Sequence, residues 1–345
     1  MRRSVSLSPL PGPAWLLLST LLWWHCEPPP EPPKMTFLPA KPLVYCDSIL
    51  RIPPPARQLS VNMIPAPADT QLQVPFDRDM LLALRRQTNY LKDKNPSAVP
   101  AKGMRNDELL HTLRLIQAGA VEPGGGLQRY FEYYQLNTEY KLDKVRITGY
   151  YTPTIDASRE RSAEYPVPVL RWPKDDGIPV PSPAAIKTGA LGGRGLEIAW
   201  LKSQKELENA QLQGSCLLQF PDGQHIFLGF GGSVKGAGGS YVFFKKIGQE
   251  VLGAGSFPLT AGYSAAIDPA VVPLGGALLA ELPICDKKGN ATCYEYKIIF
   301  AQDRGGAIKT TKRLDLYCGI GKKGLEAAKR VNNYGRLWLL LPKRM

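Results

Sequence analysis

The sequence predicts a mainly β chain whose helices are concentrated near the N-terminus. Apolar residues recur at helical spacing between residues 77 and 118. Beyond Leu142 the chain breaks into short β-branched and aromatic runs separated by Gly and Pro. Strands and helices do not alternate in the way that builds a doubly wound parallel sheet. We therefore expect barrels or sandwiches of short strands.

The first 26 residues have the pattern of an export signal. Met1-Arg2-Arg3 is positively charged, and the apolar run from Ala14 to Trp24 is too short to span a membrane comfortably. Cys26 follows this run, at the place where a bacterial lipoprotein carries its lipid, although Trp23-Trp24-His25 is bulky for that processing site. We expect an exported, periplasmic protein, and an outer-membrane lipoprotein anchored through Cys26 stays an open alternative.

Residues 27–75 are rich in proline and predict an extended tether. A first helix is expected after Asp77, which is a good N-cap, and a second over Asn106 to Ala118. A third is expected over the aromatic-rich stretch from Leu127 to Leu136. These helices serve packing, and none is assigned a chemical role.

The strand predicted at Val145 ends on Tyr150 and Tyr151 beside Gly149. Exposed tyrosines next to glycine provide a stacking surface for sugars or bases; the alternative is an aromatic pair in the core. Further along, Asp222-Gly223 predicts a hairpin. Residues 229–239 form a glycine-rich loop without the spacing of a phosphate-binding loop.

The last part of the chain combines one more helix with strands that end in aspartates. A helix is expected over Leu325 to Val331 and a closing strand over Arg336 to Leu341. Asp303 follows an apolar strand and precedes Gly305-Gly306, and Asp268 and Asp315 also leave short strands. Each aspartate alone is more often a turn former, but three together make an acid site worth considering.

Histidine and cysteine usage excludes several kinds of site. The chain has only three histidines, which disfavours a Ser-His-Asp or Cys-His enzyme. Six cysteines without a Cys-x-x-Cys motif disfavour zinc, and we expect no metal and no cofactor. Cys285 and Cys293 bracket a turn-rich loop and predict a disulfide across a hairpin.

The formal net charge of +13 suits a polyanionic partner: nucleic acid, an anionic membrane surface or an acidic polymer. A merely solvated basic surface is the alternative. Nucleic acid is the least favoured of these partners, because the export pattern and the absence of aromatic-basic stripes oppose it.

Six ordered motifs resemble the membrane-bound lytic transglycosylase A (MltA) family with its C-terminal 3D domain, which is named for three aspartates. The resemblance covers roughly residues 75–345. The motifs are Thr148-Gly149-Tyr150-Tyr151-Thr152-Pro153, Pro181-Ser182 with Gly189-Ala190-Leu191, Gln213-Gly214-Ser215, Asp268-Pro269 with Val272-Pro273-Leu274-Gly275, Ala301-Gln302-Asp303 with Gly305-Gly306-Ala307-Ile308-Lys309, and Asp315-Leu316-Tyr317 with Gly319-Ile320-Gly321.

The resemblance implies a double-psi β-barrel built from residues 76–155 and 255–345, with the 3D domain at 258–341. It further implies a smaller β domain inserted at 156–254 and a groove between the two that holds a glycan strand. The family cuts the β-1,4 bond between N-acetylmuramic acid (MurNAc) and N-acetylglucosamine (GlcNAc) in peptidoglycan and leaves a 1,6-anhydro ring.

By motif, the resemblance makes Asp315 the single catalytic residue and places Asp303 beside it. The implied substrate-binding set is Asp303, Thr148, Tyr150, Tyr151, Gln213, Gly214, Ser215, Gly305, Gly306 and Lys309. One acid suffices because the C6 hydroxyl of the sugar is the nucleophile, whereas an ordinary glycosidase needs two carboxylates. A non-catalytic peptidoglycan-binding barrel and a two-carboxylate hydrolase remain the alternatives.

The chain departs from the family at three places, one of which is Cys216, where a glycine usually follows Gln213-Gly214-Ser215. Thr310 stands where a glycine usually follows the Ala-Ile-Lys run. A tight glycine turn between Gly236 and Tyr241 replaces a longer segment, which shortens the inserted domain.

Overall fold

A computed structural model describes residues 57–60, 63–66, 74–120, 127–138 and 143–344. The expected export signal and Cys26 lie outside these residues. The fold is mainly β with N-terminal helices, as predicted from the sequence. No helix in the described part of the chain is long and apolar enough to cross a membrane.

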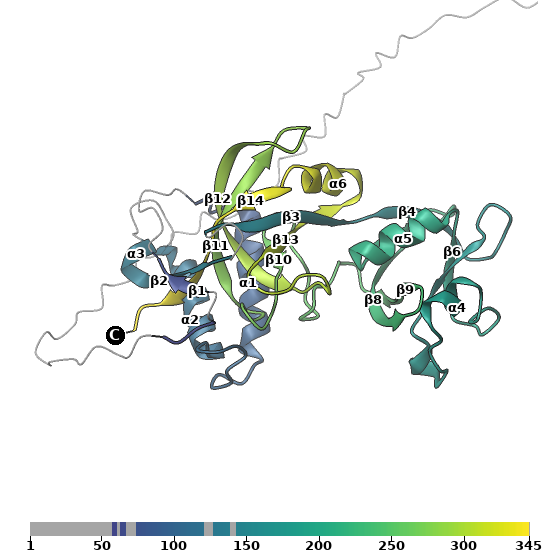
Figure 1. Ribbon diagram of the computed structural model, residues 1–345, viewed down its shortest axis with the longest axis horizontal. Helices are drawn as coiled ribbons and strands as arrows, with labels where there is room; N and C mark the ends of the chain where they lie inside the picture. Colours follow the sequence, from purple (N-terminus) through teal and green to yellow (C-terminus); the bar gives the residue numbers. More distant parts are fainter. Residues whose placement is uncertain (1–56, 61–62, 67–73, 121–126, 139–142, 345) are drawn as a thin grey trace, which may run out of the picture. The chain divides into compact units, whose positions relative to one another are not determined.

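The strands form a nine-stranded and a six-stranded sheet (Figure 1). The nine-stranded sheet has the order β1 (Met63–Pro65), β2 (Phe131–Leu136), β15 (Leu337–Pro342), β11 (Ala277–Cys285), β12 (Ala291–Asp303), β10 (Ser264–Ala266), β13 (Arg313–Ile320), β3 (Val145–Thr152), β14 (Asn333–Gly335). The six-stranded sheet has the order β5 (Val167–Leu170), β6 (Glu197–Leu201), β4 (Thr154–Ser158), β7 (Cys216–Gln219), β8 (His225–Gly236), β9 (Gly239–Ile247).

Two pairs of strands in the nine-stranded sheet are parallel, β10 with β12 and β13 with β3, and its other pairs are antiparallel. Strand β3 belongs to this sheet and β4 to the other, with only Pro153 between them. Each sheet packs on its own buried apolar cluster. Closure of the larger sheet into a double-psi barrel, and the expected domain limits, stay predictions.

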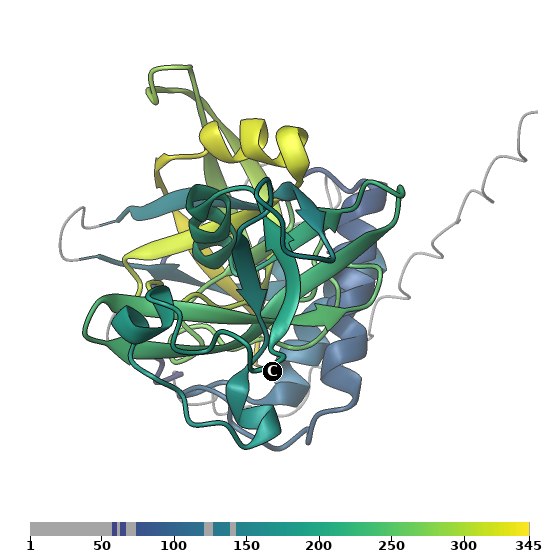
Figure 2. The same ribbon diagram turned by 90° about the vertical axis from the view of Figure 1, so that its right-hand side faces the viewer.

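The helices are α1 (Arg78–Lys92), α2 (Asn106–Leu115), α3 (Leu127–Tyr130), α4 (Pro183–Lys187), α5 (Gln204–Gln213) and α6 (Gly321–Lys329), with a π-helical turn at Ile116–Ala120 and a 3-10 turn at Pro173–Asp176. Asp77 caps α1, since its carboxylate accepts from the backbone N–H of Met80 at 2.8 Å. The helices α1 and α2 pack side by side and contact the nine-stranded sheet (Figure 2).

The prediction of a helix over residues 127–136 is wrong beyond Tyr130, where α3 ends. Residues Phe131–Leu136 form β2, which pairs with β1 on one edge and β15 on the other. The aromatic side chains of Phe131, Tyr133 and Tyr134 are buried in this position. Aromatic residues have high β propensity, and pairing with a strand more than 200 residues later outweighs the local pattern.

The prediction of a glycine-rich loop at residues 229–239 is also wrong. These residues belong to the β8–β9 hairpin, which has its turn at Ala237-Gly238. The glycines permit close packing inside the hairpin. A Cβ atom on Gly232 would lie 2.5 Å from the ring of Trp172. Glycine within a strand often marks such a close approach, and no loop cradle remains for a phosphate.

The disulfide expected between Cys285 and Cys293 does not form, and both thiols are free. The predicted hairpin itself is present, with β11 and β12 joined through residues 286–290. However, Cys293 pairs with Ile284 rather than with Cys285. Successive residues of a strand point to opposite faces, so Cys285 is buried while Cys293 is exposed.

Within the segment expected to form a tether, residues 27–75, the described residues 57–60 and 63–66 include contacts to the body of the protein. Strand β1 pairs with β2, and the guanidinium of Arg57 is buried. It donates to Glu108 at 2.6 Å, to Glu132 at 3.0 Å and to the carbonyl of Pro342 at 2.8 Å. A buried cation with two acidic partners holds this segment to α2, β2 and β15.

Candidate active site

The site residues lie along one face of the parallel ladder between β3 and β13. Three side-by-side pairs succeed one another: Arg146 with Arg313, Thr148 with Asp315, and Tyr150 with Tyr317. Because side chains alternate along a strand, residues two apart share a face. The face therefore carries, in order, cations, a carboxylate with a hydroxyl, and two phenols.

The opposite face of the same ladder belongs to the core. Ile147 and Leu314 are fully buried there. Helix α6 covers this side, and a Cβ atom on Gly149 would lie 2.6 Å from the backbone of Ala328 (Figure 1). Glycine at this position thus lets the helix rest directly on the strand.

Asp315 is held by two neighbours and remains 16% exposed at its side chain. The Nε of Arg313 donates to one carboxylate oxygen at 2.8 Å, and its Nη2 donates to the other at 3.1 Å. The hydroxyl of Thr148 also donates to the first oxygen. This forked contact fixes the orientation of the carboxylate.

Asp303 occupies a more enclosed position at the end of β12. One of its oxygens accepts from the hydroxyl of Tyr150 at 2.7 Å. The other accepts from the backbone N–H groups of Ala254 and Arg304 at 3.0 and 2.8 Å. Burial raises the pKa of Asp303 above its ordinary value of 3.8, although these hydrogen bonds act in the opposite direction.

Tyr150 shares the environment of Asp303. Burial, together with the Asp303 charge, raises the pKa of the Tyr150 phenol well above its ordinary value, so the phenol stays a hydrogen-bond donor. Its ring packs on Tyr317 with centroids 5.3 Å apart. Tyr150 is partly buried, packs on Tyr317 and donates to Asp303, and its expected contact with substrate stays a prediction.

The two aspartates are two strands apart in the sheet. Ala266 on β10 pairs with Asp303 on one side and with Asp315 on the other. Neighbouring strands lie about 4.8 Å apart, so the two aspartate backbones are separated by roughly 10 Å. The sheet thus brings the two acids predicted from the sequence to one region, with different surroundings.

The Gln213-Gly214-Ser215 motif connects the six-stranded sheet to the end of β3. The side-chain oxygen of Gln213 accepts from the backbone N–H of Tyr151 at 3.1 Å. The hydroxyls of Ser215 and Thr152 lie 2.9 Å apart, and both are buried. Gly214 has a φ of 75° and ends α5. These residues hold the strand junction, and their expected contact with substrate stays a prediction.

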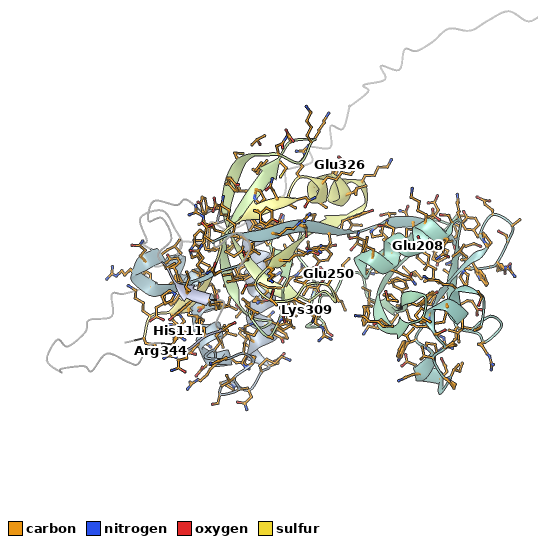
Figure 3. The ribbon with its side chains drawn as sticks, in the orientation of Figure 1. His111, Glu208, Glu250, Lys309, Glu326 and Arg344 are labelled. Atoms are coloured by element: carbon orange, nitrogen blue, oxygen red, sulfur yellow. The ribbon has the colours of Figure 1, made fainter. Side chains whose placement is uncertain are left out.

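Asp268, the third aspartate, forms turns. Its carboxylate accepts from the backbone N–H of Ala270 at 3.1 Å and of Thr310 at 2.8 Å. The second contact anchors the loop of residues 304–312, which carries Gly305, Gly306 and Lys309 between the two other aspartates. Lys309 is exposed on this loop (Figure 3) and has no hydrogen bond or ion pair with another described residue.

Thr310 has a φ of 61°, a left-handed conformation that is unfavourable for a β-branched residue. We expect Thr310→Gly to raise the free energy of unfolding by about 0.5–1 kcal/mol, because relief of about 1–2 kcal/mol of strain exceeds the entropic cost of glycine. Chemical denaturation of both proteins measures this difference. A lower stability of the variant would contradict the strain.

Neither described histidine touches the aspartates. His111 lies exposed on α2 (Figure 3), and His225 begins β8 with its ring against Phe227. Within the described residues, no group of three His, Cys, Asp or Glu side chains is placed to share a metal ion. The chemistry available on this face is that of carboxylates, hydroxyls and guanidinium groups.

Arg313 and Arg146 are not among the site residues predicted from the sequence. Arg313 precedes Asp315 by two residues in a strand, and Arg146 precedes Thr148 by two, so the strand period places each pair on one face. This spacing is the sequence signal that points to both arginines.

Comparison with known proteins assigns the chain to a family. Sequence profiles of the MltA specific insert domain and of the 3D domain match residues 146–267 and 263–341. The membrane-bound lytic murein transglycosylase A of Escherichia coli is 31% identical over 252 residues, which are 60% of this chain and 68% of that protein. The chain belongs to the lytic murein transglycosylase A family.

Other MltA proteins agree with this assignment. The Vibrio cholerae protein of the same name is 27% identical over 252 residues, covering 60% of this chain and 68% of the relative. A crystal structure of E. coli MltA with bound chitohexaose superposes with a TM-score of 0.67 at 25% identity, covering 82% of this chain and 94% of the other. The MltA fold therefore includes both sheets described above.

Proposed function

We propose that this chain is a lytic transglycosylase that cleaves the β-1,4 bond between MurNAc and GlcNAc in peptidoglycan and forms 1,6-anhydro-MurNAc. Membership of the MltA family supports the reaction class. E. coli MltA has been solved with chitohexaose bound, which supports a glycan strand as the ligand. The observation in this chain that carries the proposal is the accessible Asp315 carboxylate, held at the centre of the ladder face.

In the proposed mechanism Asp315 acts first as an acid and then as a base. Its protonated carboxyl gives a proton to the glycosidic oxygen of the leaving GlcNAc, and the C1–O bond of MurNAc breaks. The C6 hydroxyl of the same MurNAc bonds to C1 and returns its proton to Asp315. No water is consumed, so one carboxyl group serves both halves of the reaction.

Arg313 has to move for this reaction to begin. Its N–H groups occupy both oxygens of Asp315, so a glycosidic oxygen can reach the carboxyl only when the guanidinium shifts aside. The Arg313 side chain is 40% exposed and is free to rotate toward solvent. Thr148 then keeps the orientation of Asp315 through its hydroxyl.

Asp303 is proposed to position groups rather than to transfer protons. Its oxygens already accept from Tyr150 and from two backbone N–H groups, so the protein itself fixes the orientation of this carboxylate. Asp303→Asn is expected to lower turnover of purified peptidoglycan only about tenfold, because the amide keeps most of these contacts. A loss as large as that of an Asp315 variant would contradict the positioning role.

The pH dependence of stability provides a test of the raised pKa of Asp303. Its pKa in the folded protein is above 3.8, so above this pH the folded state binds more protons than the unfolded state. Wild-type stability should therefore fall as the pH rises from 3.8 through the raised pKa. Asp303→Asn should lose less stability over the same range, as measured by urea denaturation. The exposed Asp222→Asn is the matched control.

The proposed reaction is tested by mass spectrometry of digested peptidoglycan. Wild type should release muropeptides with 1,6-anhydro ends. Reducing ends alone would favour the two-carboxylate hydrolase, and binding without products would favour the non-catalytic barrel.

We also infer a location in the cell envelope, because the relatives are membrane-bound murein enzymes. Export to the periplasm and attachment to the outer membrane through Cys26 are finer proposals, supported by the export pattern of residues 1–26. Metabolic labelling with palmitate should mark wild type but not Cys26→Ala if the cysteine is lipidated. Absence of label in both would leave a soluble periplasmic protein as the outcome.

A further inference from the structure

A cavity of about 470 Å³ opens beside Asp315 and is lined by strongly basic residues. We call it the cationic pocket; its lining residues are Thr138, Lys144, Arg146, Thr148, Lys312, Arg313 and Tyr334. Four of the seven carry a positive charge and none carries a negative charge. Its volume falls in the range of pockets that hold small ligands.

The ladder register explains why these charges are concentrated. Arg146 and Arg313 are direct neighbours on adjacent strands, and Lys144, which directly precedes β3, lines the same pocket. Like charges opposite one another on a sheet destabilise it by about 0.2–1 kcal/mol. Asp315 offsets the charge of Arg313, so the charges of Arg146 and Lys144 are the ones that a further anion would offset.

Two of these cations lack an acidic partner among the described residues. Arg146 donates to the side-chain oxygen of Asn332 at 3.2 Å, and Lys144 lies 5.7 Å from the ring centroid of Tyr294. Arg313 is neutralised by Asp315. The pocket therefore offers guanidinium and ammonium donors to a ligand, and a carboxylate fits such donors.

We propose that the cationic pocket binds a carboxylate of the peptide stem of peptidoglycan. This inference rests on the proposed function. It adds recognition of the peptide stem, which takes no part in the cleavage of the glycosidic bond. A bare glycan strand of GlcNAc and MurNAc carries one lactyl carboxylate per MurNAc, whereas the attached stem carries several carboxylates further out.

The cationic pocket adjoins Asp315, and the stem belongs to the sugar that is cleaved there in the proposed reaction. Thr148 and Arg313 line the cationic pocket and also contact Asp315. The stem is attached through C3 of MurNAc, the same sugar whose C1–O bond breaks at Asp315 in the proposed reaction. A carboxylate in the pocket would also attract Arg313 away from Asp315, which couples stem binding to exposure of the acid.

The first experiment compares two substrates: intact peptidoglycan and glycan strands stripped of stems by an amidase. The double variant Lys144→Gln/Arg146→Gln is expected to raise KM for stem-bearing substrate roughly five- to tenfold, the size expected for two partly exposed charge contacts. KM for stripped strands should stay within about twofold. The control Lys322→Gln/Lys323→Gln removes the same charge from the exposed surface of α6 and should change neither value.

The second experiment measures binding of the free tetrapeptide stem to the full chain by calorimetry. Wild type should bind the peptide, the double variant should bind it at least fivefold more weakly, and a peptide with amidated carboxyl groups should not bind to either. This measurement needs no turnover. It therefore separates the pocket from the proposed function, which fails independently if wild type forms no anhydro product.

Three results would overturn the inference. The first is an equal loss on intact and stripped substrates, which would assign the pocket to the glycan backbone. The second is an unchanged KM of the double variant on intact peptidoglycan. The third is equal binding of the amidated and free peptides, which would show that carboxylates are not recognised.

Discussion

Asp315→Asn is expected to lower the turnover of purified peptidoglycan by about 10⁴-fold or more. Removal of one acid–base group typically costs about 10²–10⁴ in rate. The same residue serves both halves of the proposed reaction, so the loss should lie at the upper end of this range or beyond. The amide is nearly the same size as the carboxyl group, so glycan binding should survive.

Release of 1,6-anhydro products by each variant measures this loss. Asp222→Asn is a suitable control, because Asp222 is exposed at the turn between β7 and β8. Circular dichroism of Asp315→Asn should show a folded protein, although its ion pair with Arg313 is lost. Wild-type turnover by Asp315→Asn alongside a dead Asp303→Asn would reverse the roles proposed for the two aspartates.

Arg57→Ala is expected to lower the free energy of unfolding by about 3 kcal/mol. The Arg57 side chain is 1% exposed and bridges Glu108 and Glu132. Removal of one member of a buried ion pair typically costs 3–5 kcal/mol because its partners remain unpaired. We expect the lower end of this range, since the Glu132 side chain is 32% exposed and can be hydrated.

Lys329→Ala tests whether burial is responsible for this effect. Lys329 pairs with Glu326 at 2.9 Å, but the two side chains are 59% and 64% exposed. Its loss should change stability by no more than about 0.5 kcal/mol. Urea denaturation of both variants gives the comparison. Similar small effects for Arg57→Ala and Lys329→Ala would show that residues 57–60 and 63–66 are only loosely attached.

Local patterns were sufficient for many elements of this fold. The alternation in β3, the N-cap at Asp77 and the hairpin at Asp222-Gly223 depend on neighbouring residues, and the structure confirms all three. Strand β2 and the glycine-rich β8–β9 hairpin were missed because distant partners decide their conformation. For β2 the partner is β15, at the other end of the chain.

The site was predictable to a similar extent. Asp303 follows from its motif and from the end of β12, whereas Asp315 follows from its motif alone, because it lies inside β13 and does not leave a strand as expected. The sheet places the two aspartates on either side of Ala266. The fork of Arg313 on Asp315 and the enclosure of Asp303 by Tyr150 and Ala254 depend on rotamers and on loop packing. The spacing of residues in the sequence does not reveal such contacts. The different surroundings of the two aspartates therefore could not be predicted from the sequence.

One face of the β3–β13 ladder carries the site residues, and the other face is buried in the core. Buried Ile147 and Leu314 set the register from the core side, and a slip by one residue would expose them and bury Asp315. Core packing therefore holds the register from the side of the ladder that faces away from the 304–312 loop. A change in the conformation of this loop would leave Asp315 opposite Thr148 as long as Ile147 and Leu314 stay buried.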